Sequence, residues 1–153
     1  MIQTVAFQEF RTGLAFLRGG DAHKALPHLQ FALTEDPENP YYVSYMGLAI
    51  AATEHKWDEA ENMCMSAIRM SRRQGQLYLN LSEVYVAADR KKAATEILAR
   101  GLRYAPHDDR LKDKIASLSL RRRPFLPFLS RTNSLNRNLG KLRHQAMQAF
   151  ASF

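Results

Sequence analysis

Small and large apolar residues recur along the chain at a spacing of 34 to 35 residues. In each copy a small residue precedes a large apolar one by three positions, and a run of small, apolar and small residues follows. The three copies are Gly13, Phe16, Ala25, Leu29, Ala32 and Pro37; Gly47, Ile50, Ala60, Cys64 and Ala67; and Ser82, Tyr85, Ala94, Leu98, Gly101 and Pro106. A period of this length indicates stacked copies of one structural unit.

Each copy predicts two helices joined by a short polar turn, at residues 19–21, 54–56 and 89–91. No apolar–polar alternation typical of strands persists anywhere, so we expect an all-α fold. The small residues allow the two helix backbones to approach closely. One helix pair cannot bury its apolar face alone, and the copies should therefore stack into a solenoid.

The repeating positions resemble those of the tetratricopeptide repeat, a helix-turn-helix unit of the same period. This resemblance implies three repeats, at about 6–39, 40–74 and 75–108. Residues 109–120 then form a helix that covers the open end, with Leu111, Ile115 and Leu118 on one face. Residues 1–120 are the predicted repeat domain, and residues 121–153 are a separate tail.

In tetratricopeptide repeats the first helix of each pair lines a concave groove. The resemblance therefore implies an apolar and aromatic groove surface at one end and a polar one at the other, suited to an extended peptide with apolar anchors. For Leu14 and Leu48, burial between repeats is an equal alternative. The candidate groove residues are Phe7, Phe10, Leu14, Leu17, Tyr41, Tyr45, Leu48, Gln76, Leu79, Asn80 and Glu83.

Family members that bind the acidic C-terminus of heat-shock chaperones use a clamp of lysine, asparagine and arginine. The matching positions here are Phe10, Leu14, Tyr45, Gln76 and Asn80, and none of them is a cation. We therefore expect another partner than the acidic C-terminus of heat-shock chaperones. The size and the apolar groove are closer to the bacterial secretion chaperones built from three such repeats, which implies an adaptor, scaffold or chaperone-like role.

The tail carries the net charge. Seven of the 22 basic residues lie beyond residue 120 and none of the 15 acidic residues does, so the formal charge of +7 belongs to the last 33 residues. Two prolines keep residues 121–129 extended, and residues 134–150 could form an amphipathic helix. The candidate interaction residues of the tail are Arg121, Arg122, Arg123, Phe125, Leu126, Phe128 and Leu129.

The sequence leaves several roles open for this tail. Its apolar residues could pack on the protein's own repeats. The Pro-Phe-Leu-Pro-Phe-Leu segment at 124–129 could also occupy the groove of its own molecule or of a neighbouring copy, giving an autoinhibited or a self-associated form. The tail could also enter the groove of another protein. Binding to an anionic membrane surface or to nucleic acid is the alternative function, since basic and aromatic residues suit both.

Nothing in the sequence indicates catalysis or a cofactor. The five histidines are scattered, no Cys/His cluster has metal-ligand spacing, and no glycine-rich phosphate loop is present. We therefore expect a non-enzymatic protein without metal or cofactor. A single cysteine, Cys64, and the lack of an apolar run of about 18 residues favour the cytoplasm.

Overall fold

A computed structural model describes residues 5–119 of the chain. Within this range the chain forms seven α-helices and no strand: α1 (Val5–Arg18), α2 (Ala22–Glu35), α3 (Pro40–Glu54), α4 (Trp57–Met70), α5 (Gly75–Ala87), α6 (Lys91–Tyr104) and α7 (Asp109–Ser119). The predictions made for the tail, including the helix at 134–150, lie outside the described residues. The all-α prediction is confirmed for the part that is described.

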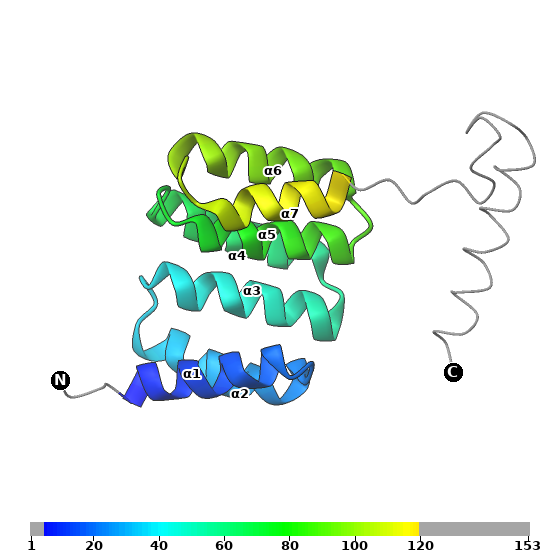
Figure 1. The fold of residues 1–153 in the computed structure, drawn as a ribbon. Coiled ribbons are helices and arrows are strands. Elements are labelled where there is room, and N and C mark those ends of the chain that lie inside the picture. Colours follow the sequence, from blue (N-terminus) through cyan, green and yellow to red (C-terminus); the bar gives the residue numbers. More distant parts are fainter. Residues whose placement is uncertain (1–4, 120–153) are drawn as a thin grey trace, which may run out of the picture. The chain divides into compact units, whose positions relative to one another are not determined.

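Consecutive helices pair as α1–α2, α3–α4 and α5–α6, and the pairs stack in sequence order with α7 against the last pair (Figure 1). Each turn inside a pair contains one residue in the left-handed region: Gly20 (φ 82°), His55 (φ 53°) and Asp89 (φ 57°). Glycine adopts this conformation without strain, whereas histidine and aspartate are less favourable there. The period therefore extends to the backbone of the turns.

The repeated small residues lie where the two helices of a pair meet. A Cβ atom added to Gly47 would come within 3.0 Å of the Ala60 carbonyl oxygen and 3.1 Å of Cys64 Sγ. Ser82 holds the same position in the third pair, and its hydroxyl donates to the Leu79 carbonyl oxygen of its own helix at 2.7 Å. The small positions of the sequence pattern thus set the close approach of the paired helices.

Two apolar clusters fill the stack. The first joins α1 and α2 to one face of α3, through residues such as Phe10, Leu29 and Ile50. The second joins the other face of α3 to α4, α5, α6 and α7, around Leu98 and Leu111. Because α3 and α5 have neighbours on both sides, their buried residues extend around most of the helix surface.

Cys64 is fully buried in the second cluster. Burial raises the pKa of this thiol to about 12, and the hydrogen bond with Ser44 lowers it only in part. The sequence predicted a small buried hydrophobic residue at this position, and the structure confirms that prediction. A thiol in this state is not a reactive nucleophile.

None of the helices between residues 5 and 119 is both long enough and apolar enough to cross a membrane.

Candidate functional site

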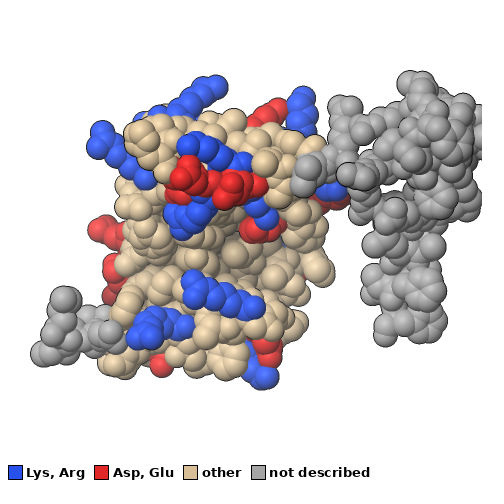
Figure 2. Space-filling model, viewed as in Figure 1, with Lys and Arg blue, Asp and Glu red and all other residues tan. Residues whose placement is uncertain are grey.

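The first helices of the three pairs, α1, α3 and α5, lie on one side of the stack together with α7 (Figure 1). We call this side the first-helix face. Figure 2 shows a recessed, mostly uncharged area in its middle, with basic side chains below and mixed acidic and basic side chains above. A hollow of about 360 Å³ lies between α5 and α7, lined by Leu79, Arg110, Asp113, Lys114 and Ser117.

The predicted apolar residues of this face differ in how far they are exposed. Phe7 is 39% exposed, whereas Phe10 is only 9% exposed. The ring of Phe10 lies 4.7 Å from that of Tyr42 and 5.4 Å from that of Tyr45. Phe10 therefore supports Tyr45 from beneath and offers little surface of its own. The half-buried members of the predicted set are Leu14, Leu17, Tyr41, Tyr45, Leu48 and Leu79.

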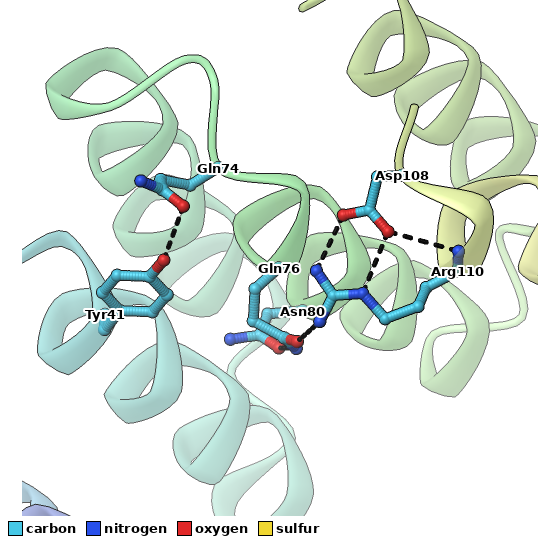
Figure 3. A network of polar contacts seen from close by, with 6 residues as sticks. All are labelled: Tyr41, Gln74, Gln76, Asn80, Asp108 and Arg110. Atoms are coloured by element: carbon cyan, nitrogen blue, oxygen red, sulfur yellow. Dashed lines mark hydrogen bonds and ion pairs between the residues drawn. The ribbon is translucent and has the colours of Figure 1, made fainter. Parts of the chain in front are cut away.

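The predicted polar end contains a chain of hydrogen bonds that leads from the surface into the core (Figure 3). Arg110 Nη1 donates to Gln76 Oε1 at 3.0 Å, and Gln76 Nε2 donates to Asn80 Oδ1 at 2.8 Å. Asn80 Nδ2 then donates to Ser44 Oγ at 3.0 Å. Asn80 is only 2% exposed and Ser44 is fully buried, so both lie beneath the surface. Gln76 is the half-buried member that reaches it.

Arg110, at the start of α7, is the residue that the sequence analysis missed. Its Nε and Nη2 donate to the two carboxylate oxygens of Asp108 at 2.9 and 2.7 Å. This pairing holds the pKa of Asp108 below its usual value. Asp108 also accepts the backbone N–H of Arg110, which caps α7. The period could have found Arg110, because it follows Gln76 by 34 residues.

Two arginines from opposite ends of the stack act on Tyr45. Burial raises the pKa of its hydroxyl, and the positive charges of Arg18 on α1 and Arg110 on α7 partly oppose this rise. Tyr45, on α3, is therefore within electrostatic reach of both α1 and α7. At the polar end, the side chain of Glu83 pairs with Lys114 of α7 at 2.5 Å.

The geometry of paired helices with a 34-residue period has a counterpart among known families. Residues 51–118, from the end of α3 to α7, match the family model of the tetratricopeptide repeat. This segment is similar to tetratricopeptide repeats. The first pair precedes the matched segment, yet its Ala25, Leu29 and Ala32 are fully buried at the tetratricopeptide repeat positions. No curated protein sequence matches the chain.

Solved structures of tetratricopeptide repeat domains have the same fold. The Sgt2 domain from Aspergillus fumigatus has a TM-score of 0.63 at 19% identity, covering 76% of this chain and 78% of that one. The TPR2B domain of yeast Sti1 in its pHsp70 complex gives 0.62 at 17%, with 78% and 100% covered. The first domain of Spaghetti (RPAP3), bound to the HSP90 peptide SRMEEVD, gives 0.60 at 19%, with 75% and 93% covered. Identities this low establish the fold alone.

Proposed function

We propose that this chain is a protein-interaction module that binds an extended segment of a partner protein along the first-helix face. The observation that carries the proposal is the half-buried apolar surface around Tyr45, formed by α1, α3 and α5. Solenoids of helix pairs use such a surface to bind extended partners. The candidate groove residues of the sequence analysis are the proposed contacts, with Phe10 and Asn80 supporting the surface from beneath.

The chemistry of the face supports a ligand with apolar anchors. Leu14, Leu17, Leu48 and Leu79 are only partly covered, so a ligand that covers them removes further apolar area from water. Tyr45 adds a rigid aromatic surface with a polar hydroxyl, a combination that is common at binding hot spots. We propose an adaptor, scaffold or chaperone-like role on this basis, as an alternative to a membrane-surface or nucleic-acid-binding function.

The replacement of Tyr45 tests the proposed contact surface. We expect Tyr45→Ala to weaken partner capture by about tenfold or more, as hot-spot residues do. The matched control is Tyr104→Ala on α6, which removes an aromatic side chain that is 39% exposed elsewhere on the molecule. The partners are captured from a lysate of the source cell and quantified by mass spectrometry. Partners that the unchanged chain captures should be lost with Tyr45→Ala and kept with Tyr104→Ala. Circular dichroism checks that both variants keep their helices.

The same capture separates apolar recognition from electrostatic recognition. Binding through apolar anchors should persist when salt is raised from low to moderate concentration, whereas binding through phosphate contacts falls steeply. If the captured partners are lost in moderate salt, or if Tyr45→Ala captures them as the unchanged chain does, the proposed groove function is wrong.

We propose further that the ligand is not an acidic chaperone C-terminus. The structures of Spaghetti (RPAP3) and of yeast Sti1 contain such chaperone peptides, but the matching positions here carry no cation. Arg110, the cation nearest to them on α7, has its charge balanced by Asp108. A titration of fluorescein-labelled SRMEEVD, followed by anisotropy, should therefore give no saturable binding.

We propose that the tail, residues 121–153, lies outside the repeat domain and mediates self-association. Its basic and apolar composition supports this, since Pro-Phe-Leu-Pro-Phe-Leu suits an apolar groove. Deletion of 121–153 should change the molar mass measured by light scattering, or raise the affinity for captured partners. If both the molar mass and partner binding are unchanged, the tail neither mediates self-association nor occupies the groove.

We infer that the chain is not an enzyme and needs no cofactor. Tetratricopeptide repeats are generally non-enzymatic interaction modules, which supports this inference. A cytoplasmic location in a bacterium remains the accompanying proposal, and cell fractionation with an antibody against the chain tests it.

A further inference from the structure

The three seams between neighbouring units are joined unequally. Across the seam between the second and third pairs, Asn80 donates to Ser44, and Tyr85 and Arg90 donate to Glu61 at 2.7 and 2.6 Å. Across the seam between the third pair and α7, Gln76 accepts from Arg110 and Glu83 pairs with Lys114. Both seams therefore hold side chains in directional polar contacts.

The seam between the first and second pairs has a different character. Within the described residues, no hydrogen bond or ion pair joins the polar side chains of 5–35 to those of 40–70. The contacts that cross it are apolar and aromatic, such as Phe10 with Tyr42 and Tyr45. The polar contact of this unit, His28 with Glu9, lies inside the first pair.

Helix contacts follow the same division. In the second seam α5 packs closely against both α3 and α4. In the first seam α2 packs closely against α3, whereas α1 has fewer contacts with α3, among them the rings of Phe10 and Tyr42. The first pair is thus held mainly through α2, by apolar packing in one cluster. The rest of the stack shares a second cluster, which Leu33 of α2 also contacts.

Apolar contacts are non-directional, whereas hydrogen bonds weaken steeply when their angle changes. We propose that α1 and α2 rotate together about α3 as one rigid body, while α3 to α7 keep their arrangement. Rotation moves Leu14 and Leu17 relative to Tyr45 and Leu48, and so sets the width of the apolar end of the groove. This use of the motion rests on the proposed function, and lets one groove accept apolar side chains of different size.

The motion itself can be measured without any ligand. Thr34, Arg69 and Arg103 are exposed and hold corresponding positions near the ends of α2, α4 and α6. Nitroxide labels on Thr34→Cys with Arg69→Cys span the first seam, and labels on Arg69→Cys with Arg103→Cys span the second. The native Cys64 is fully buried and its pKa is raised to about 12, so it should stay unlabelled.

We expect pulsed electron–electron double resonance on the full chain to give a broader distance distribution across the first seam than across the second. A rotation of about 15° moves the end of a 14-residue helix by about 5 Å, so the first distribution should be wider by about this amount. The second distribution should be narrow, because hydrogen bonds fix that seam.

Glu61→Ala is the variant that tests the cause. It removes both the Tyr85 and the Arg90 contacts, and should broaden the distribution between Arg69→Cys and Arg103→Cys. The proposed rotation is wrong if the two distance distributions are equally wide in the chain with native Glu61. It is also wrong if the distribution across the second seam stays narrow after Glu61→Ala. Neither result depends on finding a partner, so a failure of the proposed rotation can be distinguished from a failure of the proposed groove function.

Discussion

Leu98→Ala should lower the free energy of unfolding by about 3–5 kcal/mol, the range measured for fully buried leucines that leave a cavity. Leu98 is fully buried in the cluster that joins α3 to α7. The total free energy of unfolding of native proteins is only about 5–15 kcal/mol, so this single change should remove a large part of the stability. Urea denaturation followed by circular dichroism at 222 nm measures the loss.

Arg103→Ala, on the same helix, is the matched control. Arg103 is exposed, and its replacement should change stability by no more than about 0.5 kcal/mol. A loss below about 1 kcal/mol for Leu98→Ala would mean that the cluster collapses around the vacancy, or that α6 adds little to the fold. A comparable loss in Arg103→Ala would mean that the loss in Leu98→Ala does not report core packing alone.

The sequence period predicted the positions of the core well. Leu29, Cys64 and Leu98 occupy the same place in the three copies, and all three are fully buried. The reason is local: a helix face repeated every 34 to 35 residues must meet the same neighbour in every unit. The resemblance to tetratricopeptide repeats rested on these positions, and it is confirmed.

The candidate site was less predictable, because a helix face says which side a residue points to and not what covers it. Phe10 and Asn80 were predicted on the groove surface, and both are nearly covered. Phe10 is covered by tyrosines of α3, more than 30 positions away in the sequence. Arg110 was missed because the period was not carried onto α7, where it reaches back to Gln76.

The unequal seams have a sequence origin that only the structure reveals. Tyr45 on α3 and Asn80 on α5 hold corresponding positions, 35 residues apart. The tyrosine meets the aromatic ring of Phe10, whereas the asparagine meets the small polar Ser44. The same fold position therefore gives an aromatic contact in one seam and a hydrogen bond in the next. Pairing partners of this kind emerge only when the units are stacked.

Asn80→Ala should destabilise the chain by about 1–3 kcal/mol, because it leaves Ser44 Oγ buried without its donor and removes an acceptor from Gln76. Ser44→Ala should cost a similar amount, since the Asn80 amide then loses its buried acceptor. Both residues lie where α3 meets α5, so the losses should appear in the same cooperative transition in urea. Ser117→Ala, at an exposed hydroxyl of α7, is the control for serine removal and should change little.

The double variant Ser44→Ala/Asn80→Ala decides whether the two side chains act as one contact. When both partners are gone, no buried group is left unpaired by the other's loss, so the combined cost should fall short of the summed single costs by about 1 kcal/mol. Additivity within about 0.5 kcal/mol would mean that each change acts through its own cavity and that the hydrogen bond contributes nothing. A clear shortfall would show that α3 and α5 are fastened by this bond, the kind of contact that the first seam lacks.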